Sequence, residues 1–490
     1  MRFLLLNMPV SFNRWQNLEM PLGLGYIASS LLRSGHEVMI KDFEVERFVV
    51  EEMRHIMDAF RPQAVGISFR TASYRSALEC ARTLRAVDPG VIITCGGHHS
   101  TVFSEDVIKD IGCDIVVRGE GEETIRELAA ALANKQDLSK IDGISFRKNG
   151  NIFHNKDRCL IEDLDDIHFP AWDLLPMKRY SIHSVITSRG CPFSCIYCDK
   201  SVSTRQVRYR SAANVYEEIL KLKKDYGDKS IYFVDDFFFQ NKNRLSEIFG
   251  LIKSKNLKWR CQSRADAIDG DLASKAKEAG CEAVIFGLET GDPDELKFIR
   301  KNNSLEQSRN AVILTNGAGI NVRANFMLGF PISTPKSIMN TVKFAAGLPI
   351  DNCRFFLVTP LPNTELWDYV HKHNLIDKDV DWKNFDLYSS SYRIPHISAR
   401  DLICYAGAAY LYLLKKKTLK ELTVDLPKNL FSLIKKVLKT HRLRGNVSPI
   451  FGSSVNLALE IWFLIKRKSF ADKMSYLARI VSLEGNIAKG

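Results

Sequence analysis

Apolar runs of strand length alternate with helical segments along the first part of this 490-residue chain. Alternation of this kind predicts a parallel, doubly wound sheet, whose ligands bind beyond the carboxyl ends of the strands. The first part of the chain is therefore expected to form a Rossmann-like α/β domain over residues 1–143. Its strands are expected at 3–7, 37–41, 64–69, 91–95 and 114–117.

The same alternation resumes after residue 180. Six parallel strands with intervening helices predict a (β/α)6 partial barrel over 181–372, in which the chemistry lies on the loops at the strand carboxyl ends. We expect a linker over 144–180, with a short hairpin at Asn149-Gly150, and a helical region over 373–490. The strands of the barrel are expected at 183–188, 230–234, 258–263, 283–289, 321–328 and 354–358.

Three cysteines lie within eight residues, at Cys191, Cys195 and Cys198. Cysteine thiolates ligate iron–sulfur clusters and zinc, and a fully protein-ligated [4Fe–4S] cluster needs four of them. Three ligands would leave one iron open to a substrate or cofactor. A structural zinc site is the alternative, but it needs four ligands in nearby pairs, and no second pair follows. The other eight cysteines are scattered, which favours a reducing cytosol over a disulfide framework.

This loop resembles the signature CxxxCxxC of the radical S-adenosylmethionine (radical SAM) enzymes, with Tyr197 as the aromatic residue before the last cysteine. The resemblance implies that Cys191, Cys195 and Cys198 ligate a [4Fe–4S] cluster whose open iron binds SAM. Reduction by a donor such as flavodoxin or ferredoxin then cleaves SAM to a 5′-deoxyadenosyl radical.

The resemblance extends along the whole expected barrel and implies further SAM contacts at strand ends. One carboxylate of the Asp235-Asp236 pair would accept hydrogen bonds from the methionine ammonium group; the sequence does not say which. A surface salt bridge or a helix cap is the plainer interpretation of each carboxylate. The remaining contacts implied are Gln262 and Arg264 with the ribose or carboxylate, Glu289 near the ribose and methionine, and Gly329 against adenine.

The first domain resembles the cobalamin-binding Rossmann-like domain of many radical SAM enzymes. The resemblance lies in the motifs Pro-Leu-Gly-Leu-Gly at 21–25, Gly-Gly-His-His at 96–99 and Val-Arg-Gly-Glu-Gly-Glu at 117–122. Glycines at strand ends allow a backbone to approach a large flat ligand closely. The implied cobalamin contacts are Arg70, Gly96, Gly97, His98 and Glu120.

The usual cobalt-ligating motif DxHxxG is absent, because residues 42–47 after the second expected strand contain no histidine. The lower axial position of a bound cobalamin would therefore be empty, water-filled or covered by another residue. Arg70 is a candidate for that face, but a guanidinium is no metal ligand, and a surface salt bridge is its plainer role. A solvated or hydrogen-bonded loop histidine is likewise the plainer role of His98.

The last part of the chain is basic and contains apolar helical patterns at 402–414, 429–439 and 455–465. One interpretation is a helical cap on the barrel. The other is a basic amphipathic surface that contacts anionic membranes peripherally or admits a lipid-like substrate. The net charge of +12 is concentrated here, which argues against a nucleic-acid partner. No run of about 18 apolar residues suggests a transmembrane helix, so we expect a cytoplasmic protein.

These observations predict an enzyme that cleaves SAM and methylates an unactivated carbon of a small molecule with the help of cobalamin. The basic tail favours a lipid, an isoprenoid or another natural product as substrate. The alternative is an enzyme of the same architecture that performs cyclisation, carbon–carbon coupling or oxidation without methyl transfer.

Overall fold

The structure is a computed structural model, and it describes residues 1–10, 20–46, 48–199, 201, 204–377 and 380–416. The chain divides into two compact units, Met1–Ile403 and Cys404–Gly490. The expected boundary after residue 372 therefore moves, because 373–403 packs with the first unit. Of the second unit, only the residues up to 416 are described, so the helices predicted at 429–439 and 455–465 lie outside the described residues.

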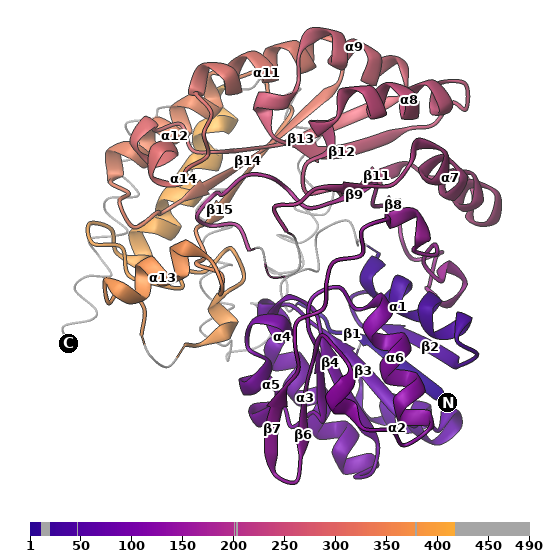
Figure 1. Cartoon of the computed structure of the whole chain (residues 1–490). Coiled ribbons are helices and arrows are strands. Elements are labelled where there is room, and N and C mark those ends of the chain that lie inside the picture. The colour runs from indigo at the N-terminus through magenta and orange to yellow at the C-terminus, as the bar shows by residue number, and fades with distance from the viewer. Residues whose placement is uncertain (11–19, 47, 200, 202–203, 378–379, 417–490) are drawn as a thin grey trace, which may run out of the picture. The chain divides into compact units, whose positions relative to one another are not determined.

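The first sheet has the strand order β2-β1-β3-β4-β5-β6-β7, and its first five strands in sequence are parallel (Figure 1). This is the doubly wound arrangement expected, with its switch point between β1 and β3. The parallel strands are β1 (Arg2–Asn7), β2 (Glu37–Asp42), β3 (Ala64–Ser68), β4 (Ile92–Gly96) and β5 (Ile115–Val117).

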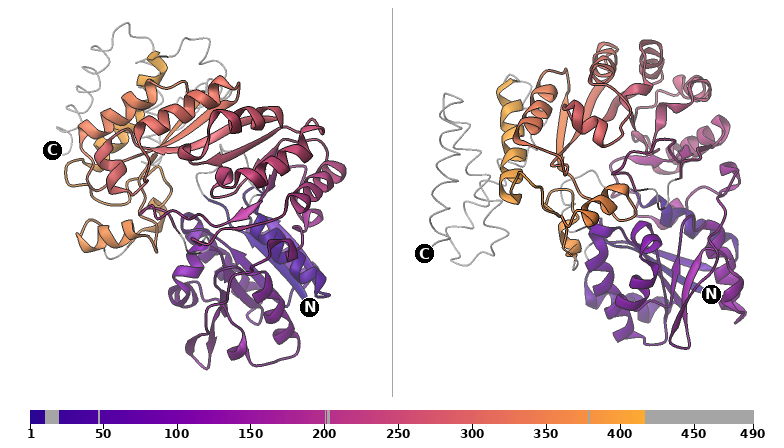
Figure 2. Two further views of the ribbon diagram at one scale, coloured as in Figure 1. Left: turned by 45° about the horizontal axis from the view of Figure 1, so that its top comes forward. Right: turned by 60° about the vertical axis from the view of Figure 1, so that its left-hand side comes forward.

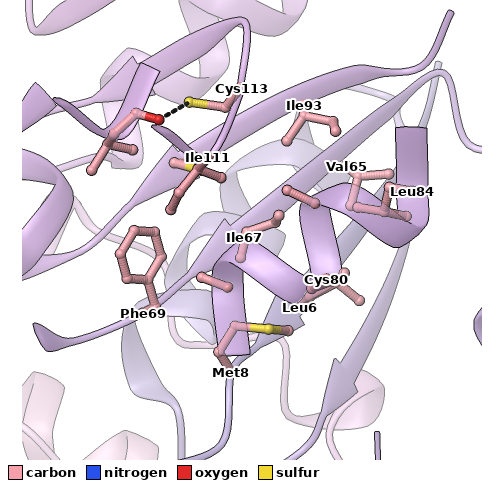
Figure 3. Close-up of a cluster of buried hydrophobic side chains, with 14 of the residues drawn as sticks. Leu6, Met8, Val65, Ile67, Phe69, Cys80, Leu84, Ile93, Ile111 and Cys113 are labelled. Atoms are coloured by element: carbon pink, nitrogen blue, oxygen red, sulfur yellow. Dashed lines mark hydrogen bonds between the residues drawn. The ribbon is translucent and has the colours of Figure 1, made fainter. Parts of the chain in front are cut away.

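Two groups of helices cover the first sheet. Helix α1 packs against α6, and α2 packs against α3. With right-handed crossovers, these pairs lie on opposite faces. Buried side chains of the strands and of α3, such as Val65, Ile67 and Leu84, form the core shown in Figure 3. The helices are α1 (Leu22–Arg33), α2 (Val50–Phe60), α3 (Tyr74–Val87), α4 (His98–Val102), α5 (Ser104–Asp110) and α6 (Glu122–Ala133).

The hairpin expected in the linker belongs to the first sheet instead. Strand β6 (Ile144–Lys148) pairs antiparallel with β5, and β7 (Asn151–His154) pairs antiparallel with β6. The turn forms as predicted, because Asn149 and Gly150 both have positive φ angles, 51° and 80°. Since β6 buries three of its side chains against the first domain, the connector begins only after residue 154.

The second sheet has six parallel strands in the order β15-β14-β13-β12-β11-β8, as the sequence predicts. Figure 1 and both views of Figure 2 show its helices together on one side of the strands. Because all six strands are parallel, their carboxyl ends line one edge of the sheet. The strands are β8 (His183–Val185), β11 (Ile231–Phe233), β12 (Trp259–Ser263), β13 (Cys281–Glu289), β14 (Asn321–Leu328) and β15 (Asn352–Leu357).

The helices of this half begin at recognisable caps. Ser211 caps α7, and Ser304 with Gln307 forms a capping box on α11. The last described helix, α14 (Ala399–Lys416), includes the apolar pattern predicted at 402–414. Among the described helices, none combines the length and apolar character that crossing a membrane requires. The other helices are α7 (Ala212–Tyr226), α8 (Lys242–Lys253), α9 (Gly270–Glu278), α10 (Pro293–Phe298), α11 (Leu305–Gly317), α12 (Pro335–Ala346) and α13 (Glu365–Lys372).

Candidate active site

The three clustered cysteines lie on a loop that a short antiparallel ladder closes. Its strands are β9 (Ser188–Arg189) and β10 (Arg208–Tyr209), and we call residues 190–207 between them the cluster loop. Gly190 opens this loop with a φ angle of 99°, and a Cβ there would lie 2.3 Å from the Gln206 carbonyl oxygen. Glycine is therefore required at this position. The ladder places the cysteines directly beyond the first strand of the partial barrel.

Asp235 and Asp236, the carboxylate pair after β11, have different surroundings. Asp235 is fully buried, and it accepts hydrogen bonds from the Thr187 amide at 2.7 Å and from the Thr187 and Ser188 hydroxyls at 2.6 Å each. Burial raises the pKa of Asp235, although these hydrogen bonds oppose the change. Asp236 is exposed at the strand end. Asp235 therefore fixes the entry to the cluster loop, and the contact of Asp236 with SAM stays a prediction.

The cysteine loop fits an iron–sulfur cluster in its donor chemistry. None of the three cysteines forms a disulfide. The Cys198 amide donates to the Cys195 carbonyl at 3.1 Å, a turn that brings these two residues together. Within the described residues, no three His, Cys, Asp or Glu side chains are grouped to hold a single metal ion. Three thiols on one short loop match a cluster with an open iron, whereas a structural zinc needs four ligands.

Arg264 contacts two side chains of this loop and also donates to the Lys301 carbonyl outside it. Its guanidinium makes two hydrogen bonds to Asp266, at 2.9 and 2.7 Å, and lies 3.7 Å from the Cys195 sulfur. It also stacks 3.5 Å from the ring centroid of Phe193 in the cluster loop. The predicted neighbour Gln262 lies in β12, which ends one residue before Arg264, and it accepts from the Tyr232 hydroxyl at 3.4 Å. Arg264 is thus placed to hold the loop.

Glu289 ends β13 with a φ angle of 67°, in the left-handed region. Its carboxylate binds the Lys301 ammonium at 2.8 Å and the Tyr197 hydroxyl at 3.0 Å. Burial and the Glu289 charge raise the pKa of Tyr197 well above its usual value. Sequence reasoning missed Lys301, which follows α10 and lies at no strand end. The structure therefore joins the predicted residues Tyr197 and Glu289 directly, and the buried Lys301 ammonium donates to both.

Gly329 is enclosed by the segment that follows the barrel. Its carbonyl accepts a short hydrogen bond from the Tyr392 hydroxyl, and its φ angle is 91°. A Cβ at this position would lie 2.8 Å from side-chain carbons of Ile394 and Leu402. The backbone conformation thus favours glycine here, and the contact with adenine stays a prediction.

The Gly-Gly-His-His motif lies at the carboxyl end of β4, beside the cluster loop. Gly97 has a φ angle of 102°, and a Cβ there would lie 2.7 Å from the Phe69 carbonyl oxygen. His98 Nδ1 lies 3.3 Å from the Asp199 carboxylate, and Asp199 directly follows Cys198. Gly96 ends β4 and its carbonyl accepts from the Phe69 amide. The end of β4 therefore reaches the residue next to a cluster cysteine.

His99, the second histidine of the motif, belongs to the core. It is 2% exposed, its Nδ1 lies 3.1 Å from the Thr71 hydroxyl, and its ring packs on Tyr74 and Trp382. Burial lowers its pKa to about 4. His99 therefore remains neutral and structural near pH 7.

The other two predicted cobalamin contacts, Arg70 and Glu120, differ in how exposed their side chains are. Arg70 is exposed at the end of β3, as a ligand contact requires. Glu120 is buried, and both of its carboxylate oxygens bind arginines of the β9–β10 ladder. Its contact with cobalamin is not supported by this position, because the carboxylate is already paired.

The first sheet has features that fit a corrinoid. Its strand order places a crevice at the carboxyl ends of β1 and β3, and the Gly96-Gly97 backbone at the end of β4 has no side chain to obstruct a flat ligand. Asp42 at the end of β2 is buried and accepts from Tyr180 and Asn7, at 2.5 and 2.7 Å. The absence of a histidine in residues 42–47 means that this segment supplies no lower ligand to cobalt.

Comparison with known proteins agrees with this geometry. Residues 185–345 match the Radical SAM superfamily, and residues 14–129 match the B12 binding domain. An uncharacterized methyltransferase of Pyrococcus horikoshii is 35% identical over 413 residues, which cover 82% of this chain and 90% of the relative. An anaerobic magnesium-protoporphyrin IX monomethyl ester cyclase of Synechocystis is 30% identical over 372 residues, covering 73% and 74%.

Two further proteins are similar to this chain, one in sequence and one in structure. The hopanoid C-3 methylase of Methylococcus capsulatus is 27% identical over 384 residues, covering 75% of this chain and 71% of that protein. Among solved structures, the cobalamin-dependent S-adenosylmethionine radical enzyme OxsB superposes with a TM-score of 0.72 at 18% identity. The superposition covers 99% of this chain and 75% of OxsB and shows the shared fold.

The cluster loop and the partial barrel define a radical SAM enzyme. More particularly, the chain belongs to the family of radical SAM enzymes with a B12-binding domain, which includes its methyltransferase relatives. The expected cofactors, a [4Fe–4S] cluster, SAM and cobalamin, are confirmed with this membership.

Proposed function

We propose that this protein is a cobalamin-dependent C-methyltransferase that acts on an unactivated carbon of a small molecule. The observation that carries the proposal is the contact of His98 with Asp199, at 3.3 Å, because it joins the β4 end of the B12-binding domain to the cluster loop. When bound, the cluster and SAM supply a 5′-deoxyadenosyl radical and cobalamin supplies the methyl group. The protein has to hold these groups close together and exclude water.

Each predicted residue then has a distinct task. Cys191, Cys195 and Cys198 hold the cluster, and the exposed Asp236 accepts hydrogen bonds from the SAM ammonium. Glu289, fixed by Tyr197 and Lys301, offers its second carboxylate oxygen to the ribose or methionine of SAM. These roles remain proposals, as do contacts of Gln262 and Gly329 with SAM and of Arg70, Gly96, Gly97 and His98 with cobalamin.

The substrate that we propose is a lipid or an isoprenoid. Two observations support it: the hopanoid C-3 methylase is a relative, and the basic, apolar sequence after residue 402 suits contact with an anionic membrane surface. We propose a cytoplasmic enzyme that meets the membrane peripherally and receives electrons from a donor such as flavodoxin or ferredoxin. Co-sedimentation of the full chain with vesicles of anionic and of zwitterionic lipid tests the membrane contact; equal recovery with both contradicts it.

Anaerobic purification followed by three assays tests the function. Iron and sulfide analysis should give four of each per chain, the visible spectrum should show a corrinoid, and SAM should be cleaved to 5′-deoxyadenosine. Cys195→Ala should abolish SAM cleavage, whereas Cys159→Ala, which changes an exposed cysteine outside the loop, should not. SAM cleavage by Cys195→Ala would overturn the radical SAM assignment, and a cluster without corrinoid would overturn the methyl-transfer step.

A radical cyclase without methyl transfer is the second candidate, favoured by the identity of 30% with the magnesium-protoporphyrin ester cyclase. SAM labelled at its methyl carbon distinguishes the two candidates once a substrate is in hand. A methyltransferase places the label in the product, whereas a cyclase leaves the product unlabelled.

A further inference from the structure

Four charged residues connect the B12-binding domain to the base of the cluster loop. They are Glu120, Glu122, Arg189 and Arg208, and we call them the Glu–Arg cluster. Arg208 makes two hydrogen bonds to Glu120, at 2.9 and 2.7 Å. Arg189 reaches Glu120 at 3.1 Å and Glu122 at 2.5 Å. Glu120 thus receives both arginines, and Glu122 receives one.

The two arginines occupy the two ends of the cluster loop. Arg189 lies two residues before Cys191, and Arg208 is its direct partner in the β9–β10 ladder. This ladder consists of two residue pairs only, so its own hydrogen bonds give the loop little support. The glutamates come from the turn between β5 and α6, and Glu122 is the first residue of α6. The carboxylates therefore hold both ends of the loop from the other domain.

The four side chains of the Glu–Arg cluster are buried, so they can pair in few alternative arrangements. Side-chain exposure is 5% for Glu120, 4% for Arg208, 10% for Glu122 and 15% for Arg189. Burial would raise the pKa of Glu120, but the hydrogen bond from Arg208 and the charges of both arginines lower it overall. A buried ion pair adds little net stability, yet loss of one partner leaves an uncompensated charge that is costly. Such a pair acts mainly by fixing a single arrangement.

The Glu–Arg cluster also contacts helix α1 and the connector. The Arg189 guanidinium lies 5.4 Å from the ring centroid of Tyr26 in α1. The Ile161 amide, in the connector, donates to Glu120 at 3.1 Å, and the Ile161 carbonyl accepts from Arg208. The first domain, the connector and the cluster loop therefore meet at one carboxylate.

We propose that Glu120 and Glu122 are positioning residues, which set where the cluster loop lies relative to the B12-binding domain. They do so by clamping Arg189 and Arg208 at the two ends of the loop. This inference rests on the proposed function, because a fixed placement matters only if the two domains hold cofactors that act on one substrate. Motions of the loop would change the separation of the two cofactors, and small misplacements of reacting groups are costly to rate.

The test compares Glu120→Gln, Glu122→Gln and the wild type as anaerobically purified holoenzymes. Hydrogen exchange is measured by mass spectrometry on peptides covering 186–193 and 206–211. Each glutamine keeps the shape but removes the charge, so exchange in both peptides should accelerate about tenfold, which is the expected result of weakening a buried ion pair. Unchanged exchange in both variants would overturn the proposal.

Two controls separate positioning from loss of the fold. Glu123→Gln changes the next residue of α6, which is half-exposed and 3.6 Å from Arg158, and should leave exchange in both peptides unchanged. If Glu122→Gln unfolds, Glu122→Asp is measured instead, because it keeps the charge but draws the carboxylate back from Arg189. It should also accelerate exchange, and unchanged exchange in a folded Glu122→Asp variant contradicts the clamp. Hydrogen exchange does not depend on catalysis. If the wild type cleaves no SAM, the proposed function is wrong, but the exchange rates still test the role of the two glutamates.

A second readout concerns coupling of the two domains. In the clamp variants, reductive SAM cleavage without substrate should persist, while transfer of the methyl label to any product falls more than about tenfold, as expected from misplaced reactants. Equal loss of both activities would indicate a merely structural role.

Discussion

The guanidinium carbon of Arg264 lies 3.5 Å from the ring centroid of Phe193, so a buried cation stacks on the loop that carries the three cysteines. Arg264→Lys keeps the charge but loses the planar stack and the two-bond contact with Asp266. We expect iron to leave the anaerobic protein several-fold faster, consistent with a loss of about 1–2 kcal/mol. Release to a chelator, followed by absorbance, measures this.

Arg309→Lys is the matched control, because Arg309 is exposed and lies 5.5 Å from the Phe344 ring centroid, away from the cysteine loop. Equal iron release from Arg264→Lys and Arg309→Lys would contradict a supporting role of Arg264.

The two adjacent aspartates should respond oppositely to the same substitution. Asp235→Asn replaces one of the two buried acceptor oxygens, which together receive three hydrogen bonds, with an NH2 donor, so it should lower the free energy of unfolding by about 2–4 kcal/mol. Asp236→Asn should leave the melting temperature unchanged but weaken SAM binding about tenfold, because the charge that faces the SAM ammonium is lost. Thermal melting and equilibrium dialysis with SAM give the two values. A reversed pattern would exchange the roles assigned to the aspartates.

Lys301 should contribute strongly to the stability of the fold through its buried ion pair with Glu289. Lys301→Met leaves the Glu289 carboxylate buried without its cation, at an expected cost of about 3–5 kcal/mol in the free energy of unfolding. Tyr197→Phe removes one hydrogen bond to the Glu289 carboxylate but leaves its cation in place, so it should cost less, about 1.5–3 kcal/mol. Urea unfolding compares both with Lys297→Met, which changes an exposed lysine of α10. Similar values for Lys301→Met and Lys297→Met would refute the buried ion pair.

His99 should make stability depend on pH. Burial lowers the pKa of His99 from 6.5 to about 4. Between these values the unfolded chain binds a proton that the folded chain does not, so the free energy of unfolding falls as the pH falls from 6.5 towards 4, by up to about 3 kcal/mol. Urea unfolding of the holoenzyme between pH 7 and 5 should show this dependence reduced in His99→Phe.

His396→Phe, a change at an exposed histidine, should keep the pH dependence of the wild type. The same slope in His99→Phe as in the wild type would show that other groups cause it.

Much of the architecture is predictable from the sequence, because the apolar runs that become β1, β3 and β4 are buried on both faces and therefore uninterrupted. The sequence places the hairpin at 144–154 in the linker, because two short strands after a complete βα pattern carry no signal of which sheet they join. The cysteine spacing likewise predicts the cluster loop, as a local pattern of ligands within eight residues.

The supporting contacts of the site were less accessible to sequence reasoning. Lys301 is twelve residues from Glu289, and Glu120 is 88 residues from Arg208. Ion pairs over such separations depend on the fold and leave no local pattern. The motif that contains Glu120 suggested a ligand contact because glycines flank the carboxylate, whereas in the structure these glycines form the turn that presents it to the arginines.

The hydrogen bond from Tyr180 to Asp42, at 2.5 Å, joins the end of the connector to the end of β2. Burial raises the pKa of Asp42, against the hydrogen bonds that it accepts. A recombination event that replaced one half of the gene at the connector would part this donor from its acceptor and leave a buried carboxyl group behind. The connector should therefore descend with the first half, and a chimera that exchanges the B12-binding half should be viable only when residues 1–180 are inherited as one block.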